Sequence, residues 1–337
     1  MTQNILIFRS DMLGDTLLTL PVVEALKAYD PDASVTFVCH PDLSDLLTRH
    51  PHIHQVVPFS AGRRAARASE LLRLWRALKQ KRYDLTVVAH ARKDFHVLSR
   101  LVGSKRSVGY RRKWGRYLLT DTIEDLKYQA GKHEIEYNLD LLRPLGLDPA
   151  SPVFRIPSAM DDEANARFAK ASVGAEEGRS LILVHPFSSD ARKCWSRSAF
   201  VDVIRALARA DGEAIGILGS KEEQPSAEAM RKEAGRGVFN FCGLTSLRGL
   251  VALIRSARLI IGQDSGPVHL AAGTGTPALC LFARFAGGPS PARWKPWGSV
   301  HHVLHEDFNQ LTAERVLMEA HRMIRNLAKE PPLPSGG

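Results

Sequence analysis

The chain has 337 residues and is 44% hydrophobic, 24% charged and 7% aromatic. This composition is typical of a globular protein and excludes wholesale disorder and fibrous repeats, and the length suggests two domains of about 150 residues. The formal net charge of +10 leaves nucleic acid, an anionic membrane surface and an acidic substrate open as partners.

Apolar runs and helical patterns alternate along the first half of the chain. The apolar runs predict strands at residues 5–8, 35–39, 56–58, 85–89 and 108–109. Helices are expected at residues 16–29, 43–49, in a basic segment that ends at Lys81, at 95–102 and at 133–145, where Gly146 would cap the last one.

The same alternation restarts after a proline-containing stretch at residues 149–157. Strands are predicted at 181–185, 214–218, 239–241, 259–262 and 278–282, and helices at 159–171, 198–210, 225–234, 247–256, 267–273 and 312–327. This order predicts an α/β protein with two Rossmann-like, doubly wound domains, residues 1–155 and 156–330. Because ligands of such sheets bind at the carboxyl ends of the strands, we expect a site in a cleft between the domains.

The sequence lacks the patterns of a signal peptide, a membrane span, a disulfide framework and a metal site. No basic segment followed by a long apolar run opens it, so no signal peptide is expected, and no run of 18 apolar residues predicts a membrane span. The four cysteines are widely spaced without a CxxC pair, which favours a reduced, cytoplasmic protein. The thirteen histidines include no pair in a context typical of metal ligands, so we expect no metal site.

The positive charge is concentrated in one segment. Residues 61–116 hold 17 basic and three acidic residues, whereas the rest of the chain holds 29 basic and 33 acidic residues. Part of the segment fits the solvated face of an amphipathic helix. The cluster of Arg63, Arg64 and Arg67 and the basic run that begins at Arg111 also fit an anionic ligand, and both interpretations stay open at this point.

Two carboxylates follow the first predicted strand, in the sequence Asp11-Met-Leu-Gly14-Asp15. Gly14 would permit a tight turn, and Asp15 stands where a helix N-cap residue is expected. Capping accounts for Asp15 but leaves the second carboxylate of the loop unexplained. A carboxylate at the carboxyl edge of a sheet is also well placed to act as a general base, so both roles are candidates for Asp15.

A compact, glycine-rich loop follows the fourth predicted strand of the second half. It contains Asp264-Ser265-Gly266 and continues with Pro267, which suits the first turn of a helix. The free amides and the positive end of that helix would bind a phosphate, and a capped helix without a ligand is the alternative. The chain contains neither a complete dinucleotide fingerprint nor a P-loop sequence.

Two further loops of the second half carry polar residues at strand ends. Ser188 and Ser189 precede Lys193 after the first strand, and this lysine would neutralise charge on a leaving phosphate. Glu222 and Glu223 follow the second strand, where carboxylates often hold ribose hydroxyls. A solvated lysine and two acids that begin a helix are the alternative interpretations.

Together these motifs resemble those of the bacterial heptosyltransferase family, the ADP-heptose:lipopolysaccharide glycosyltransferases. The resemblance covers nearly the whole chain in order. It includes Asp11-x-x-Gly14-Asp15, Arg82-Tyr83-Asp84-Leu85, Val108-Gly109-Tyr110, Lys193-x-Trp195, Gly219 with Glu223, Asp264-Ser265-Gly266-Pro267-x-His269 and Pro291-Ala-Arg-Trp294-x-Pro296-x-Gly298.

The resemblance implies a GT-B fold, whose C-terminal helix returns towards the N-terminal domain, and an inverting, metal-independent heptose transfer without a cofactor. Asp15 matches the general base that takes the proton of an acceptor hydroxyl, and Lys193 matches a residue at the donor phosphates. The implied donor-binding residues are Ser188, Ser189, Lys193, Glu222, Glu223, Asp264, Ser265, Gly266 and His269. The implied acceptor-binding residues are Asp11, Gly14, Arg63, Arg64, Arg67 and Arg111.

The implied partners are a nucleotide sugar and an anionic glycolipid, the lipopolysaccharide inner core. A monomer at the cytoplasmic face of the inner membrane, in peripheral contact with it and binding no nucleic acid, is expected. The loops at residues 90–95 and 284–289 depart from the family pattern, which leaves the donor sugar and the acceptor open. A transferase for another nucleotide sugar or acceptor, a nucleotide-sugar epimerase and a non-catalytic binder of anions or nucleic acid are the alternatives.

Overall fold

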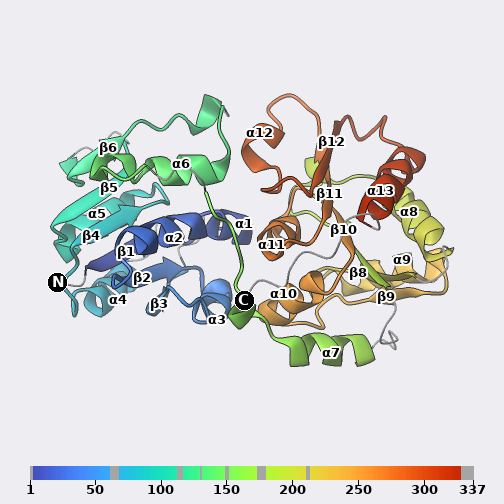
Figure 1. Cartoon of the computed structure of the whole chain (residues 1–337), viewed down its shortest axis with the longest axis horizontal. Coiled ribbons are helices and arrows are strands. Elements are labelled where there is room, and N and C mark those ends of the chain that lie inside the picture. The colour runs from blue at the N-terminus through green and yellow to red at the C-terminus, as the bar shows by residue number, and fades with distance from the viewer. Residues whose placement is uncertain are drawn as a thin grey trace. The chain divides into compact units, whose positions relative to one another are not determined.

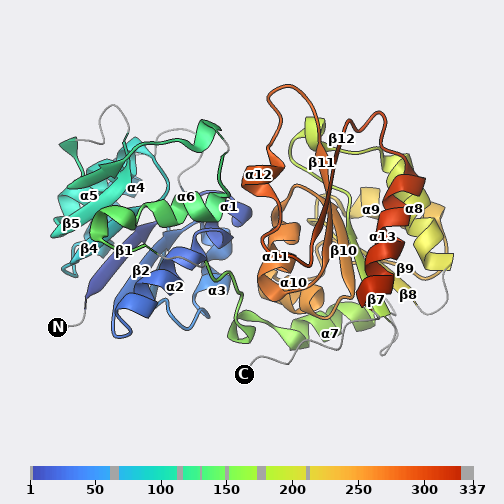
Figure 2. The ribbon, with the colours of Figure 1, turned by 45° about the horizontal axis from the view of Figure 1, so that its top comes forward.

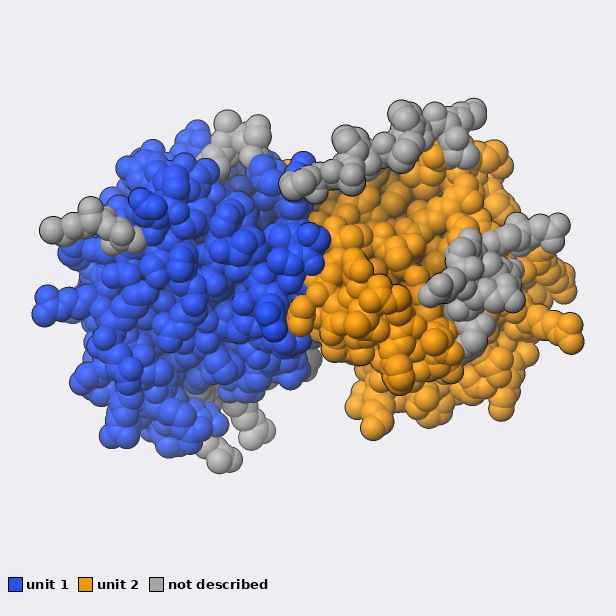
Figure 3. Space-filling model, turned by 60° about the horizontal axis from the view of Figure 1, so that its bottom comes forward, with its two compact units in different colours: residues 1–160, 292–294 blue, residues 161–291, 295–337 orange. Residues whose placement is uncertain are grey.

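The computed structural model describes residues 3–60, 68–111, 117–129, 131–148, 152–172, 180–209 and 213–327. The chain divides into two compact units (Figure 3). The first consists of Met1–Met160 with Ala292–Trp294, and the second of Asp161–Pro291 with Lys295–Gly337.

The first unit is built on a six-stranded, parallel sheet (Figure 1). Its strands are β1 (Asn4–Phe8), β2 (Ser34–Cys39), β3 (Gln55–Pro58), β4 (Leu85–Val88), β5 (Arg106–Tyr110) and β6 (Asp121–Ile123), in the spatial order β3-β2-β1-β4-β5-β6. Its helices are α1 (Leu13–Leu17), α2 (Leu20–Tyr29), α3 (Ser44–Leu47), α4 (Ala68–Leu78), α5 (Lys93–Val102) and α6 (Glu134–Asp140), and most of the short helix α12 (Pro291–Trp294) belongs to the same unit.

The first sheet is covered on both faces, as its buried strands require. On one face, Leu74 and Leu78 of α4 and Phe95 and Leu98 of α5 form a core with the sheet. Right-handed crossovers place the helices between β1 and β3 on the opposite face, where α2 contacts α6 (Figure 2).

The second unit repeats this architecture. Its strands are β7 (Ser180–His185), β8 (Glu213–Ile217), β9 (Val238–Asn240), β10 (Leu259–Gln263), β11 (Ala278–Ala283) and β12 (His302–Glu306), in the order β12-β11-β10-β7-β8-β9. Its helices are α7 (Glu163–Ser172), α8 (Arg197–Arg209), α9 (Gln224–Ala234), α10 (Leu247–Arg255), α11 (Gly266–Thr274) and α13 (Ala313–Leu327). Helix α13 packs against α8 over one core, and α10 contacts α7 and α11.

Each sheet has a topological switch point, which is the place where the chain reverses the direction in which it adds strands to the sheet. Strand β1 pairs with both β2 and β4, and β7 pairs with both β8 and β10. From each of these pairs, β1 with β4 and β7 with β10, the following strands run outwards in opposite directions. Loops that leave the carboxyl ends of two such strands diverge, and ligands of doubly wound sheets bind in the space between those loops.

The predicted α/β class with two doubly wound sheets is confirmed, and the differences are local. Strands β6 and β12 escaped sequence analysis; both are edge strands with largely half-buried residues and therefore lack a strong apolar pattern. The helix predicted at 16–29 is two helices, because Pro21 lies in the first turn of α2 and cannot continue a preceding helix. None of the described helices is both long and apolar enough to cross a bilayer.

Candidate functional site

Arg9 organises the carboxyl edge of the first sheet directly after β1. The residue is 3% exposed. Its Nε donates to Asp11 Oδ1 at 2.8 Å, its Nη2 to Asp15 Oδ1 at 2.5 Å and its Nη1 to the carbonyl of Ala89 at 3.2 Å. Because Ala89 follows β4, one guanidinium joins the two loops that diverge at this switch point. The two carboxylates expected from the sequence are thus brought together by a buried cation.

Asp15 lies in the first turn of α1 and is not its N-cap. Met12 occupies the cap position, and Gly14 is an ordinary helical residue of the same turn rather than a residue with a positive φ. The capping interpretation of Asp15 is therefore wrong. The backbone carbonyl of Asp15 accepts a hydrogen bond from Thr19 Oγ1, while its carboxylate faces Arg9 and stays 25% exposed.

Glu134 of α6 supplies a third carboxylate and is fully buried. Its Oε1 lies 2.5 Å from Lys127 Nζ and 3.6 Å from Arg9 Nη1, and its Oε2 lies 2.8 Å from Arg293 Nη2. Arg293 belongs to the first unit although it lies 159 residues further along the chain than Glu134. Three cations and three carboxylates form one network, in which Glu134 and Arg9 are the central pair.

The network shifts the pKa values of its three carboxyls in different directions. Burial raises the pKa of both Asp11 and Asp15 above the ordinary aspartate value, although Arg9 acts in the opposite direction. Burial also disfavours the charged form of Glu134, but the cations around it lower its pKa below the ordinary glutamate value. Asp15 is therefore a partly exposed carboxylate with an increased affinity for a proton, as a general base requires.

His90 completes this edge from the loop after β4. Its Nδ1 lies 3.8 Å from Asp11 Oδ2, and burial, assisted by Arg9 and Arg92, lowers the pKa of His90 to about 4. The imidazole is therefore neutral at pH 7. Within residues 90–95, which depart from the family pattern, Arg92 Nη2 lies 2.8 Å from Asp94 Oδ2.

Lys193 and Asp264 meet at the switch point of the second sheet. Lys193 closes the 3-10 helix Ala191–Lys193 after β7, and Asp264 follows β10. Lys193 Nζ lies 2.6 Å from Asp264 Oδ2. The ammonium group thus stands across the gap between two diverging loops, where a phosphate of a bound nucleotide would meet a fixed positive charge.

Gln263, at the end of β10, holds the Lys193 loop in place. Its buried amide accepts a hydrogen bond from the backbone N of Trp195 at 2.5 Å and donates to the carbonyl of Pro186 at 2.9 Å. Both ends of the loop between Pro186 and Trp195 are therefore tied to the strand that precedes Asp264. Sequence reasoning gave Gln263 no role, because its partners are 68 and 77 residues away.

The residues around Asp264 have the geometry of a helix start. Ser265 is the N-cap of α11 without a side-chain capping bond, and its hydroxyl lies 3.1 Å from His185 Nδ1. Gly266 and Pro267 begin the helix, so its first amides point to the carboxyl edge of the sheet. His269, in the same helix, is buried at 4% exposure.

The remaining donor-side candidates lie on neighbouring loops. Glu223 Oε2 accepts a hydrogen bond from the backbone N of Ser220 at 2.6 Å, and Glu222 beside it is exposed. Ser188 Oγ accepts from the backbone N of Asp190 at 3.3 Å, and Ser189 is exposed. Since β8, β7 and β10 are neighbours, these loops follow three adjacent strands and reach the same edge.

Of the four arginines expected to bind the acceptor, only Arg111 lies among the described residues. Arg111 is exposed at the end of β5, and its backbone N donates to the carbonyl of Ile123 at 2.7 Å. Arg63, Arg64 and Arg67 lie outside the described residues. Sequence reasoning missed Lys127, Glu134 and Arg293, because Arg9 and Arg293 both lie far along the chain from the segment that carries Lys127 and Glu134.

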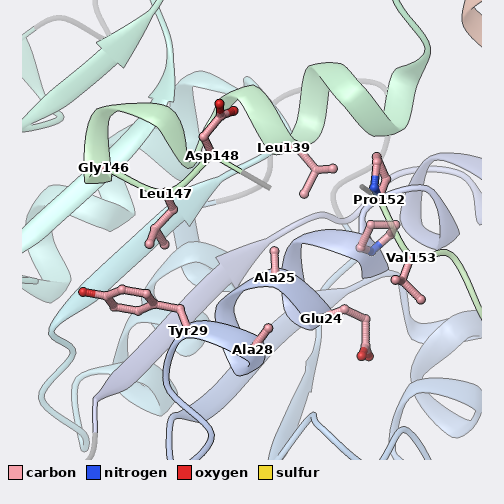
Figure 4. Close-up of a pocket in the computed structure, with 11 residues that line it drawn as sticks. Glu24, Ala25, Ala28, Tyr29, Leu139, Gly146, Leu147, Asp148, Pro152 and Val153 are labelled. Atoms are coloured by element: carbon pink, nitrogen blue, oxygen red, sulfur yellow. The ribbon is translucent and has the colours of Figure 1, made fainter. Parts of the chain in front are cut away.

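The first unit also contains a pocket of about 570 Å³ that no candidate residue lines (Figure 4). It lies between α2 and the residues Leu139, Gly146, Leu147, Asp148, Pro152 and Val153. Its charged lining residues are Glu24 and Asp148. Two carboxylates do not suit a phosphate-bearing ligand. Within the described ranges, no group of three His, Cys, Asp or Glu side chains has the arrangement of a metal site.

Comparisons of the sequence and of the fold with those of known proteins both find glycosyltransferases of the heptosyltransferase family. The model of glycosyltransferase family 9 (heptosyltransferase) matches residues 71–320. Lipopolysaccharide heptosyltransferase 3 of Escherichia coli is 29% identical over 297 residues, which cover 85% of this chain and 84% of that protein.

Two solved structures share the fold at 20% identity. A family 9 glycosyl transferase from Veillonella parvula has a TM-score of 0.86 and covers 96% of this chain and 97% of its own. The ADP-heptose lps heptosyltransferase II of E. coli has a TM-score of 0.81 and covers 96% and 99%. The predicted fold class and the resemblance noted from the motifs are both confirmed.

Proposed function

The chain belongs to glycosyltransferase family 9, and from that premise we propose that it moves a heptose from ADP-heptose to a hydroxyl of the lipopolysaccharide inner core. The names of its relatives support both substrates, since one is a lipopolysaccharide heptosyltransferase and another an ADP-heptose heptosyltransferase. The proposal assigns acceptor activation to the first unit and donor binding to the second.

The observation that carries the proposal is the state of Asp15. Its carboxylate is partly exposed at the switch point of the first sheet, is oriented by the buried Arg9 and has a pKa raised by burial. A carboxylate in this state accepts a proton from a hydroxyl as that oxygen becomes a nucleophile. Asp11 shares the same guanidinium and, with Arg111 and the arginines at 63, 64 and 67, is proposed to orient the anionic acceptor.

Donor binding is proposed for the edge around Lys193. The ammonium of Lys193 and the amides at the start of α11 would neutralise the negative charge that develops on the diphosphate, so the reaction would need no metal ion. Asp264 holds Lys193 and would contact the donor sugar, and Glu223 or Glu222 would hold the ribose hydroxyls.

The proposed step has a simple balance of bonds. The acceptor oxygen forms a bond to the anomeric carbon of the heptose, and the bond from that carbon to the diphosphate oxygen breaks. Asp15 takes the hydroxyl proton, and ADP leaves with the electron pair of the broken bond. A single displacement of this kind inverts the anomeric configuration.

The test is an assay of ADP release from ADP-heptose with heptose-deficient lipopolysaccharide as acceptor. We expect release to require the acceptor, to persist in EDTA and to fall at least a hundredfold in Lys193→Ala. NMR of the product would report the anomeric configuration. Release of ADP without acceptor, or an isomerised sugar as sole product, would count against transfer. A panel of other nucleotide sugars distinguishes a different donor from an inactive protein.

We also propose that the enzyme acts as a monomer at the cytoplasmic face of the inner membrane. Light scattering behind a sizing column should give the mass of one 37.3 kDa chain. Fractionation of cells should recover the protein on the cytoplasmic side, and a periplasmic location would contradict the proposal.

A further inference from the structure

Helices α4 and α5 carry exposed apolar side chains on the surface that faces away from the first sheet. Leu72 of α4 is 43% exposed, and Val97 and Leu101 of α5 are 37% and 58% exposed. Val97 and Leu101 are four residues apart and therefore lie on the same side of α5. The inner sides of both helices already supply the core of the unit, so packing within this unit does not account for these three side chains.

The same surface is positively charged. Arg73 and Arg76 of α4 and Lys93 and Arg100 of α5 are all exposed. The two acidic residues of these helices are less exposed than the cations. Glu70 and Asp94 are both half-buried, and Asp94 pairs with Arg92 at 2.8 Å. The two helices thus expose four cations and three large apolar side chains, whereas neither of their two acidic residues is exposed.

The two helices form one continuous surface. Trp75 Nε1 of α4 donates to the carbonyl of Leu101 of α5 at 3.2 Å, and both helices contribute to one core. We define the α4–α5 face as Leu72, Arg73, Arg76, Lys93, Val97, Arg100 and Leu101. Helix α5 begins at Lys93, a short loop after β4 ends at Val88, so the end of this face that carries Lys93 lies towards the carboxyl edge on which Asp15 lies.

We propose that the α4–α5 face lies on the surface of a bilayer that contains anionic lipids. Its arginines and lysine would contact lipid phosphates, and Leu72, Val97 and Leu101 would enter the headgroup region. Nucleic acid would use the cations but gain nothing from the three apolar side chains, so the combination favours a lipid surface. The inference rests on the proposed function in one respect. If the acceptor is anchored in a lipid bilayer, the carboxyl edge with Asp15 has to lie near the membrane, and the α4–α5 face would bring it there.

The test is cosedimentation with vesicles of phosphatidylcholine alone or with phosphatidylglycerol, with no sugar nucleotide present. We expect binding only to the anionic vesicles, and weaker binding at high salt. Each cation near the surface contributes about fivefold, so R73Q/R76Q should bind more than tenfold more weakly and depend less on salt. L72S/L101S should also lose binding, but keep the salt dependence.

Matched controls lie on the second unit. K232Q/R236Q removes two exposed cations, and F168S/M318S removes two exposed apolar side chains, so both should bind anionic vesicles as the wild type does. Absence of vesicle binding by the wild type, or equal losses in the control variants, overturns the inference. Binding of a DNA duplex that R73Q/R76Q weakens and L72S/L101S leaves intact, without vesicle binding, would assign the face to nucleic acid instead.

An activity measurement separates this inference from the proposed function. With a deacylated, water-soluble acceptor, L72S/L101S should keep the kcat/KM of the wild type. With the acceptor embedded in anionic vesicles, the same variant should lose at least tenfold. No transfer with either acceptor would refute the proposed function and leave the vesicle result standing, whereas equal activity of variant and wild type on vesicles would refute the membrane role.

Discussion

Asp11 and Asp15 share the guanidinium of Arg9, which lowers the pKa of each carboxyl and so opposes the effect of burial. Burial raises the pKa of both carboxyls, and the charge of Asp11 raises that of Asp15 further. Three carboxylate neighbours raise the pKa of Arg9 despite its burial, so its charge is constant over the accessible pH range. The proton affinity of the proposed base is thus set by its burial first and then by its charged neighbours.

The pH profile of kcat should report this arrangement. A base must be ionised, so activity should fall as pH decreases through a pKa above the ordinary aspartate value. In Asp11→Asn, one negative charge is removed and Arg9 is left to Asp15, so the acidic limb should move to lower pH. The limb is measured at saturating donor and acceptor, and a limb that stays in place or moves upwards contradicts the coupling.

Asp15→Asn should lower kcat by roughly 10²- to 10⁴-fold, the range that a general base contributes. The amide oxygen can still accept from Arg9, so we expect little change in the KM of the donor and in the melting temperature. Steady-state kinetics of ADP release and a thermal melt check both expectations. An active Asp15→Asn enzyme would assign the base to another residue.

Glu134 should matter for stability as well as for the site. Glu134→Gln leaves Lys127 and Arg293 near a neutral group in a buried position, and breaking a buried ion pair costs about 3–5 kcal/mol. Urea unfolding should therefore show a loss of this size. The matched control is Glu163→Gln, which breaks an exposed pair with Arg167 and should change the free energy of unfolding by less than about 1 kcal/mol.

At the scale of the element, the proposed role of Lys193 in donor binding depends on the position of the loop between β7 and α8. Its 3-10 helix carries Lys193, and the strand end at Gln263 holds the backbone on both sides. Two aromatic side chains of the loop also anchor it. Trp195 is buried in the core of the second unit and donates from Nε1 to the carbonyl of Leu311 at 3.0 Å, and Phe187 packs against the same core. The two hydrogen bonds of the Gln263 amide add to these anchors by holding the backbone at Trp195 and Pro186.

Gln263→Leu should raise the KM of the donor at least tenfold, because Trp195 N and Pro186 O lose their partner and Lys193 loses its alignment with Asp264. The KM of the acceptor should stay within twofold. Titration of ADP by calorimetry checks the effect independently of turnover. Gln310→Leu, at an exposed position, is the control and should bind ADP as the wild type does.

At the scale of the whole molecule, buried histidines connect stability to pH. Burial lowers the pKa of His50, His90, His185 and His301 to about 4. The unfolded chain binds protons at these residues with a pKa near 6.5. Acidification between these values therefore favours the unfolded state.

The free energy of unfolding should thus fall as pH decreases from about 6.5 to about 4. His185, which is buried at the end of β7, should contribute about 3 kcal/mol of this loss. Urea unfolding at several pH values measures the slope, and His185→Asn should make it shallower. A slope that the substitution leaves unchanged would show that other groups control the acid sensitivity.

The sequence by itself determined the fold class, the central strands of both sheets and the loops that carry Asp15, Lys193 and Asp264. Central strands are buried on both faces and therefore form apolar runs in the sequence, and the loops with the candidate site residues follow these strands. The edge strands β6 and β12 were missed because they are only partly buried.

Only the tertiary structure decided which charges meet. Arg9, Glu134 and Arg293 come from distant parts of the chain, and their pairing follows from the winding of the sheet and not from any local pattern. The tertiary structure also showed that Asp15 lies in the first turn of α1 and is not its N-cap. It likewise showed that Gln263 forms hydrogen bonds with both ends of the Lys193 loop. Local propensity specifies elements, whereas the pKa and the orientation of a side chain depend on neighbours that folding brings close.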